Sequence, residues 1–439
     1  MKTPIYDFVK SYSDRQEVRF HMPGHKGIGS LGIEALDITE ISGADVLYSP
    51  NGIIAESEDN ASSLFGTAHS FYCTEGSTLA IKAMLALAAG ASESDRPKVV
   101  AARNVHKAFV YAAALLDLDV QWIYPAESSH LCACPITAEL AENAILSCKE
   151  KPCALYLTSP DYLGGIADIK SIAAVCHRHG IPLLVDNAHG AYLAFLESSM
   201  HPIALGADIC CDSAHKTLPV LTGGAYLHIS KSANPTFCEN ARQALSLFAS
   251  TSPSYLTLQS LDLCNKYLTE GYRDKLADTV ARVRETRKTI HAFGLDVLDC
   301  EPLKIVIRQG FALGEHLREA GIEPEFCDSD FTVLMVTPEN TREDLFALLT
   351  ALSAFDTPTG SPSALPSAPK CQQVISIRKA IFAKQETIPS YMAEGRICAS
   401  PTVSCPPAIP IAVSGERIST EAAAALLRYG IDSISVVKE

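Results

Sequence analysis

An excess of basic charge, long apolar runs and a paired cysteine framework are all missing from this sequence. The formal net charge is −14, which argues against nucleic acid or an anionic membrane as a partner, because both attract positively charged proteins. No apolar run is long enough to predict a membrane span, and no apolar stretch after Met1 predicts a signal peptide. The 15 cysteines are scattered without a C-x-x-C pair, so we expect reduced thiols and a cytoplasmic location.

Two kinds of binding motif are missing as well. Residues 20–27 carry two histidines and a lysine among glycines, but no strand precedes them and no G-x-x-x-x-G-K-[ST] pattern occurs, so a Walker loop is not expected. Cys132-Ala133-Cys134 has a spacing that could bind a metal, yet no pair of His or Cys residues accompanies it. We therefore expect no metal site.

The residues that are present suit a large folded core. Hydrophobic residues make up 47% of the chain and charged residues 20%, which favours a globular protein with little disorder. Short apolar segments alternate with helical patterns; the predicted strands are 70–73, 99–102, 120–124, 154–158, 183–185, 209–211 and 225–228. This alternation is typical of βαβ units and predicts the α/β class with a mostly parallel sheet.

Changes in composition predict five segments along the chain. Glycine and proline are dense in 1–60, which we expect to be an N-terminal arm of turns rather than helix. The large α/β domain follows over 61–285, and a smaller α+β domain over 286–354. A Pro/Ser-rich linker over 355–370 then leads to a C-terminal domain over 371–439.

Two strand exits carry the residues of greatest chemical interest. The apolar run 206–211 is followed by Ser213, His215 and Lys216, and the apolar run 181–185 is followed by Asp186. A lysine next to anion-binding groups suits a Schiff base with a phosphorylated aldehyde, and a carboxylate at the neighbouring exit suits a pyridinium nitrogen. The alternative for the lysine alone is a solvated side chain in a loop.

A third stretch presents backbone donors at a helix start. Gly76, Ser77 and Thr78 precede an apolar helix over 79–89, and the N-terminus of a buried helix binds phosphate through free N–H groups. Ser77 or Thr78 capping the helix is the alternative. Ligands bind at the carboxyl ends of the strands in a parallel sheet, where all of these stretches and the segment 103–107 are expected to meet.

Several motifs, taken in order along nearly the whole chain, resemble the ornithine/lysine/arginine decarboxylases. The matching stretches are Phe20-His21-Met22-Pro23-Gly24-His25-Lys26-Gly27, Arg103-Asn104-Val105-His106-Lys107, Asp186-x-Ala188-His189-Gly190, Ser213-x-His215-Lys216-Thr217-Leu218, Ser250 to Tyr255, Ser260-Leu261-Asp262, Glu394-Gly395-Arg396, Pro406 to Pro410 and Gly415-Glu416. The resemblance implies a fold-type-I enzyme, similar to aspartate aminotransferase, with a mostly parallel seven-stranded sheet. It also implies pyridoxal 5'-phosphate (PLP) as cofactor, held by the domain 61–285. The chain resembles the short members of the family, similar to biosynthetic arginine decarboxylase.

The resemblance also implies a role for each matching residue. Lys216 forms the Schiff base and is later freed for proton transfer, and Asp186 keeps the pyridine nitrogen protonated. His106 stacks on one face of the cofactor ring and Ala188 lies against the other, while His189 lies near the ring hydroxyl and the substrate carboxylate. The residues implied to hold the phosphate are Gly76, Ser77, Thr78, Ser213 and His215.

Some positions depart from the family pattern. Asn187 and Tyr192 stand where family members often carry an acid and a second histidine, and Ser404-Cys405-Pro406-Pro407-Ala408 replaces a more usual aromatic-Pro-Pro-Gly. The last stretch borders the substrate side chain in relatives, so the substrate stays open among arginine, lysine and ornithine, with arginine first.

The function implied is decarboxylation of a basic amino acid for polyamine synthesis, by a homodimer with active sites at the subunit interface. In relatives, the stretch containing Thr251 and Ser252 approaches the neighbouring subunit's cofactor. One alternative is an aminotransferase or lyase of the same fold, in which Arg396 or Arg378 would clamp the substrate carboxylate. A catalytically silent PLP-binding regulatory partner is the other alternative.

Overall fold

The structure is a computed structural model that describes residues 1–125, 130–356, 368–401 and 410–438. The chain forms two compact units, each built from separate stretches of sequence. The first unit contains Met1–Ser92 and Ile169–Asp274, and the second contains Glu93–Asp168 and Lys275–Glu439. The five segments expected from composition stay a prediction.

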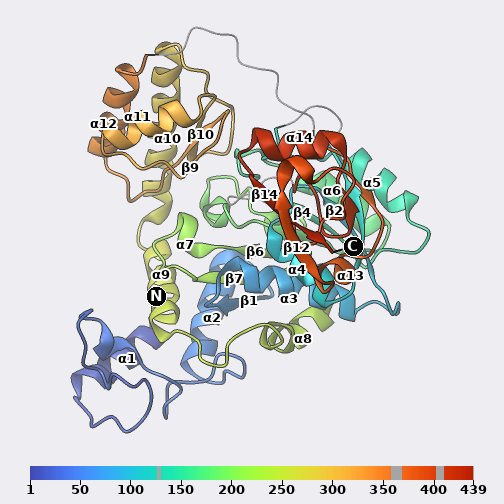
Figure 1. Ribbon diagram of the computed structural model, residues 1–439. Coiled ribbons are helices and arrows are strands. Elements are labelled where there is room, and N and C mark those ends of the chain that lie inside the picture. The colour runs from blue at the N-terminus through green and yellow to red at the C-terminus, as the bar shows by residue number, and fades with distance from the viewer. Residues whose placement is uncertain (126–129, 357–367, 402–409, 439) are drawn as a thin grey trace. The chain divides into compact units, whose positions relative to one another are not determined.

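A seven-stranded sheet with the order β1-β7-β6-β5-β4-β2-β3 confirms the expected α/β fold. Its strands in the first unit are β1 (His69–Cys73), β5 (Leu183–Asp186), β6 (Ile209–Asp212) and β7 (Ala225–Ile229); those in the second are β2 (Lys98–Ala102), β3 (Asp119–Ile123) and β4 (Ala154–Thr158). The pairs β5–β6, β2–β3 and β2–β4 are parallel, whereas β7 is antiparallel to both β1 and β6. Figure 1 shows β1, β6 and β7 running side by side.

The helices of the first unit include one that is apolar on nearly every side. They are α1 (Pro4–Asp14), α2 (Ile53–Phe65), α3 (Gly76–Gly90), α6 (Ile169–Arg178), α7 (Ala214–Thr217), α8 (Pro235–Ser246) and α9 (Tyr255–Thr269), with 3₁₀ helices η1 (Glu34–Leu36), η2 (Ala191–Phe195) and η3 (Pro202–Leu205). In α3, residues such as Leu79, Met84 and Leu87 are buried, as expected for a helix without a polar face. The helix begins at Gly76, three residues before the predicted start.

The expectation of turns rather than helix over 1–60 is wrong in two places. Helix α1 occupies residues 4–14, and α2 begins at Ile53. Ile5, Val9 and Tyr12 are buried on one face of α1, and their spacing of four and three residues is a helical signal. Pro4 fits the first turn, where no intrahelical partner for its nitrogen is needed.

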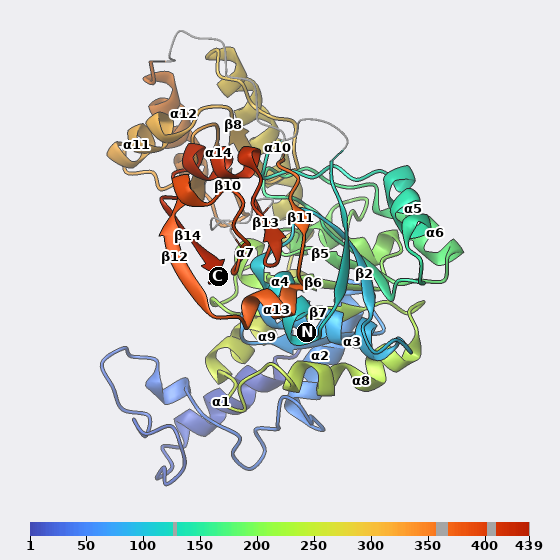
Figure 2. The same cartoon turned by 45° about the vertical axis from the view of Figure 1, so that its right-hand side comes forward.

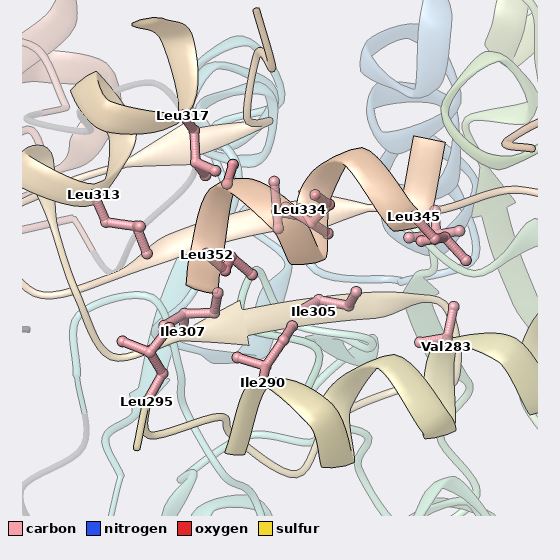
Figure 3. Close-up of a cluster of buried hydrophobic side chains, with 13 residues drawn as sticks. Val283, Ile290, Leu295, Ile305, Ile307, Leu313, Leu317, Leu334, Leu345 and Leu352 are labelled. Atoms are coloured by element: carbon pink, nitrogen blue, oxygen red, sulfur yellow. The ribbon is translucent and has the colours of Figure 1, made fainter. Parts of the chain in front are cut away.

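The second unit has a smaller α+β part with its own core. Strands β8 (Lys304–Ile307), β9 (Phe326–Cys327) and β10 (Thr332–Met335) form a sheet in the order β8-β10-β9, accompanied by α10 (Tyr272–Ala292), α11 (Phe311–Glu319) and α12 (Arg342–Ser353). Side chains from these helices and strands, such as Ile290, Ile305 and Leu313, point toward one another in one buried cluster (Figure 3).

The remaining elements of the second unit are helices beside the sheet and a C-terminal set of short strands. They are α4 (Lys107–Leu115), α5 (Ala138–Ser147), β11 (Gln372–Gln373), α13 (Ile377–Ile381), β12 (Gln385–Pro389), η4 (Ser390–Met392), β13 (Glu416–Arg417), α14 (Thr420–Arg428) and β14 (Ser433–Val437). Strands β12 and β14 pair antiparallel, as Figure 2 shows. Most of the predicted linker, and Cys405 with its neighbours, lie outside the described residues.

The structure also bears on two expectations from the sequence, which concern membrane-spanning helices and the state of the cysteines. Among the described residues, no helix combines the length and the hydropathy that crossing a membrane requires. Every cysteine that the structure describes is free, and many are buried.

Candidate active site

The ends of β5 and β6 bring the main candidate residues together. The two strands are parallel, with Asp186 at the end of β5 opposite Cys211 of β6. Strand β6 ends at Asp212, and the single turn of α7 begins two residues later at Ala214. Asp186 and the segment that carries Lys216 therefore leave the sheet at the same edge, as parallel strands require.

Lys216 lies against His189. Its Nζ is 3.0 Å from Nε2 of His189, although the two residues are 27 positions apart in sequence. His189 is buried and Lys216 is half-buried. An ammonium group has only donors, so the bond requires His189 to accept at Nε2 when Lys216 is charged.

Asp186 is almost completely buried at the edge of the sheet. Its side chain is held by local donors, since Oδ1 accepts the N–H of Ala188 at 3.2 Å and the thiol of Cys211 at 3.6 Å. The residue is 3% exposed. A carboxylate held in this way is oriented before any ligand arrives.

The start of α3 offers an open cradle next to Ser213. Oγ of Ser213 donates to Oγ of Ser77 at 2.9 Å, so the first turn of α3 lies beside the segment that follows β6. Gly76 has a φ of +72°, and apart from its neighbours in the chain and the backbone of its own helix, no described atom lies within 4 Å of the position where a Cβ would stand. Its N–H donates to the carbonyl of Gly223 at 2.7 Å.

Capping does not explain the Gly-Ser-Thr turn. Glu75 is the N-cap residue of α3, and among the described residues no side chain caps this helix. The alternative interpretation of Ser77 or Thr78 as a cap is therefore wrong. The uncapped first turn can donate backbone N–H groups to an anion.

His215 is oriented by the backbone. Its Nδ1 lies 3.0 Å from the carbonyl oxygen of Gly224, so Nδ1 must carry a proton. Burial lowers the pKa of the His215 imidazole, which favours the neutral form. In that form Nε2 has no proton, so His215 can donate to a phosphate only when it is protonated.

His106 belongs to the second unit, whereas the other nine candidate residues belong to the first. It is the N-cap of α4, and its Nδ1 accepts the N–H of Ala108 at 3.1 Å. Arg103, three residues earlier, is fully buried and makes a bidentate ion pair with Glu416 at 2.7 and 2.8 Å. The strand exit that carries His106 is therefore anchored to the C-terminal part of the same unit.

Sequence reasoning missed a buried polar cluster around Asp212. Asp212 is completely buried; its Oδ1 accepts from Asn187 at 2.6 Å, and its Oδ2 accepts from Nε2 of His201 at 3.0 Å and of His228 at 3.2 Å. Burial opposes ionisation of Asp212, but the two imidazoles outweigh it and hold the pKa of its carboxyl well below the usual range. Histidines inside apolar runs were the signal that could have revealed this cluster.

Among the residues that the structure describes, two groups of side chains have the composition of a metal site. They are His130 with Cys132 and Asp328, and His201 with Cys210 and Asp212. The sequence expectation overlooked His130 beside Cys132.

The donor chemistry of both groups argues against a metal ion. Nδ1 of His130 accepts the N–H of Cys132 at 3.1 Å, which leaves the ring proton on Nε2, the atom that would have to bind the ion. In the other group, burial raises the pKa of the Cys210 thiol well above its usual value, and Nε2 of His201 already bonds Asp212.

The residues fit PLP in type and position. The amine of Lys216, the buried carboxylate of Asp186 and the uncapped first turn of α3 provide the three groups that an aldehyde, a pyridinium nitrogen and a phosphate need. All of them lie in the first unit, at the ends of β5 and β6 and beside Ser213.

Known proteins match this chain over nearly its whole length. The family described as "Orn/Lys/Arg decarboxylase, major domain" matches residues 3–311. The arginine decarboxylase of Bacillus subtilis is 32% identical over 461 residues, covering 96% of this chain and 92% of that protein. The arginine decarboxylase of Halalkalibacterium halodurans is 30% identical over 466 residues, covering 97% and 93%.

A solved structure shows the same fold at lower sequence identity. The lysine decarboxylase of Francisella novicida is 18% identical, covers 99% of this chain and 81% of its own, and superposes with a TM-score of 0.83. The expected fold type is thereby confirmed.

Proposed function

Because the chain belongs to the Orn/Lys/Arg decarboxylase family and is therefore an amino-acid decarboxylase, we propose that it removes the α-carboxylate of a basic amino acid with the help of PLP. Arginine is the first candidate substrate, since relatives of about 30% identity over nearly the full chain are arginine decarboxylases. The contact between Lys216 and His189 at 3.0 Å, beside the buried Asp186, carries the proposal.

PLP, when bound, accepts the electron pair that the departing carboxylate leaves behind. The buried carboxylate of Asp186 keeps a proton on the pyridine nitrogen, which maintains the ring as an electron sink. Ser77, Thr78 and Ser213 hold the phosphate, together with N–H groups of the first turn of α3. Ala188 is small enough to lie against one face of the ring, and His106 is proposed for the other.

Proton movement at Lys216 is the proposed task of His189. Nε2 of His189 accepts the hydrogen bond from Nζ, so it can take the proton and leave the amine neutral for attack on a carbonyl carbon. The same pair can return a proton to the substrate carbon after carbon dioxide has left. Lys216 lies in α7 shortly after β6, and His189 lies in the turn after β5, so both groups are held near strand ends and little motion is needed to align them.

A second copy of the chain is the proposed partner of the N-terminal arm. Val18, Phe20, Ile28 and Leu31 are each at least 80% exposed, and such a dense set of exposed apolar side chains usually marks an interface. Thr251 and Ser252 stay predicted contributors to the neighbouring site. A sedimentation measurement on Phe20→Ser with Leu31→Ser tests the homodimer, since loss of this surface should yield monomers.

An aminotransferase is less well supported, because both arginines considered for a carboxylate clamp have other partners. Arg396 pairs with Glu386 at 2.6 Å. Arg378 donates to the carbonyls of Ala114 and Leu115, each at 3.0 Å. Analysis of the product separates these functions, since a decarboxylase yields carbon dioxide and an amine whereas an aminotransferase yields a keto acid.

The decisive experiment combines spectroscopy with gas release. We expect the protein with PLP to show a visible absorbance band that Lys216→Ala lacks, and to release carbon dioxide from one of arginine, lysine or ornithine. A protein that binds no PLP contradicts the cofactor assignment. A protein that binds PLP without turnover of any of the three favours the silent regulatory partner. The cytoplasmic location and the role in polyamine synthesis stay predictions.

A further inference from the structure

A buried acid–amide pair joins the two strand exits that carry the catalytic groups. Asn187 directly follows Asp186 at the end of β5, and Asp212 directly precedes Ser213 at the end of β6. The amide nitrogen of Asn187 donates to Oδ1 of Asp212 at 2.6 Å, and neither residue is exposed. The backbone adds a second link, because the N–H of Asn187 donates to the carbonyl of Cys211 at 3.0 Å.

The carboxylate of Asp212 is held on both of its oxygens. While Oδ1 accepts from Asn187, Oδ2 accepts from His201 and His228. His228 reaches further, since its Nδ1 lies 2.8 Å from Oγ of Ser70 in β1. The cluster therefore connects β5, β6, β7 and β1 from inside, and a charged acceptor makes its hydrogen bonds stronger than neutral ones.

The turn after Asn187 leaves this side chain little freedom. A Cβ on Gly190 would overlap Oδ1 of Asn187, and the N–H of Gly190 donates to the carbonyl of Asn187 at 2.8 Å. Asn187 is thus confined between the Gly190 turn and Asp212. Since Ala188 and His189 lie in that same turn, displacement of Asn187 displaces them too.

We propose that Asp212 is a positioning residue for the reaction: its buried carboxylate, through Asn187, keeps Asp186 and His189 in register with Ser213 and Lys216. The proposal rests on the PLP-dependent function given above. It also accounts for the departure at position 187. An acid at position 187 would face the carboxylate of Asp212 at hydrogen-bond distance, so an amide at position 187 fits an acidic residue at position 212.

The geometry allows the acid and the amide to change places. In Asn187→Asp with Asp212→Asn, the amide oxygen of residue 212 can accept from both histidines while its nitrogen donates to the new carboxylate. Every hydrogen bond of the cluster then persists, and only in the bond between residues 187 and 212 do donor and acceptor change places. Asn187→Asp alone puts two buried carboxylates against each other, which is strongly unfavourable.

The experiment is a double-mutant cycle with three measurements on the full chain. The dissociation constant of PLP comes from titration of the visible band, the melting temperature is measured with and without PLP, and kcat and KM for arginine are expressed per bound PLP. For Asn187→Asp we expect at least tenfold weaker PLP binding and about a hundredfold lower kcat with KM changed less than threefold. The double variant should recover at least tenfold in both PLP binding and kcat.

Asp208→Asn is the matched control. It removes a carboxylate from the residue directly before β6, at the opposite end of that strand from Asp212. Asp208 accepts from His177 and from the N–H of Leu183. This variant should change the melting temperature while PLP binding and kcat stay within twofold of the unmodified protein. If Asn187→Asp does not fold, recovery of folding in the double variant supports the coupling, and Asp212→Asn then tests positioning through a kcat lowered about fivefold.

Two results would overturn the proposal. One is a double variant no better than Asn187→Asp in PLP binding and kcat; the other is a lower melting temperature with kcat per bound PLP unchanged, which is what a purely structural role produces. Failure of the proposed function is recognised separately. In that case the unmodified protein turns over no basic amino acid. The dissociation constant of PLP and the melting temperature still measure the coupling between residues 187 and 212.

Discussion

Opposite ends of the β5–β6 pair carry the same two residue types in different surroundings. At the start of β6, Asp208 accepts from Nε2 of His177 at 3.0 Å, and the His177 side chain is 45% exposed. At the end of β6, Asp212 accepts from His201 and His228, and none of these side chains is more than 1% exposed. The contact of Asp208 with His177 is thus open to water, whereas the contacts of Asp212 with His201 and His228 are buried. We call the end of β6 at Asp212 the dry end.

Burial decides what each contact contributes. An ion pair within reach of water is screened and contributes about 0–1 kcal/mol, whereas loss of one partner from a buried pair costs about 3–5 kcal/mol. The dry end coincides with the carboxyl ends of parallel strands, where α/β proteins bind their ligands. The rigidity that the reaction needs is therefore concentrated at one edge of the sheet.

Replacement of Lys216 should give the largest effect at the dry end. Lys216→Ala removes the amine that contacts His189, so carbon dioxide release should fall by at least about 10⁴-fold while the far-ultraviolet circular dichroism is unchanged. Lys231→Ala, at an exposed lysine after β7, is the control and should keep full activity. Measurable turnover by Lys216→Ala would contradict the assignment.

Loss of the carboxylate at the end of β5 should have the next largest effect. Asp186→Ala leaves the pyridine nitrogen without its anionic partner, so kcat should fall by roughly 10²–10³-fold, about what one preorganised electrostatic contact supplies. Steady-state kinetics with saturating PLP measure this. Equal activity in Asp186→Ala and the unmodified protein would show that the carboxylate does not act on the cofactor.

Removal of each aspartate tests the difference between the two ends directly. Asp212→Ala leaves two imidazoles and the amide of Asn187 without their acceptor, so the free energy of unfolding should fall by about 3–5 kcal/mol. Asp208→Ala should cost less, about 1–3 kcal/mol, because the contact with His177 is exposed to water and the main loss is the acceptor of the Leu183 N–H. Urea denaturation of the two variants measures both values, and similar losses would show that burial is not what separates the two ends.

The dependence of stability on pH should separate Asp212 from another buried carboxylate, Asp262. Asp262 accepts from Ser57 and from the N–H groups of Ile5 and Tyr6, all neutral donors, and burial raises its pKa to about 6. Its contribution is therefore present below the unfolded pKa of about 3.9 and is lost as the pH rises through about 6. The pKa of Asp212 is lowered instead, so its contribution persists above about pH 4 and is lost only in acid.

Urea midpoints between pH 4 and pH 8 measure this contrast. Relative to the unmodified protein, Asp262→Asn should gain stability between pH 4 and about pH 6, whereas Asp212→Asn should be less stable at every pH from 4 to 8, because its two histidine partners lose their acceptor. An Asp212→Asn variant as stable as the unmodified protein at pH 7 would contradict the charge state assigned to Asp212.

Much of the α/β part could be predicted because its signals are local. Every strand expected between residues 70 and 228 occurs, with ends within one residue of the prediction, since short apolar runs bounded by turn formers are typical of buried strands. Helix α1 was missed because proline and glycine nearby suggested turns, although Ile5, Val9 and Tyr12 carried a helical period. Residue type and strand-exit position also pointed to Lys216 and Asp186.

The sequence by itself thus determined the fold class, the family and the chemical types at the strand exits, because these follow from local patterns and motifs. Only the tertiary structure decided which side chains share a hydrogen bond. The contact of Lys216 with His189 spans 27 residues and that of Asn187 with Asp212 spans 25, and neither has a periodic signature. Such pairs exist because two parallel strands end at one edge, and the burial that makes them strong arises only when the sheet has formed.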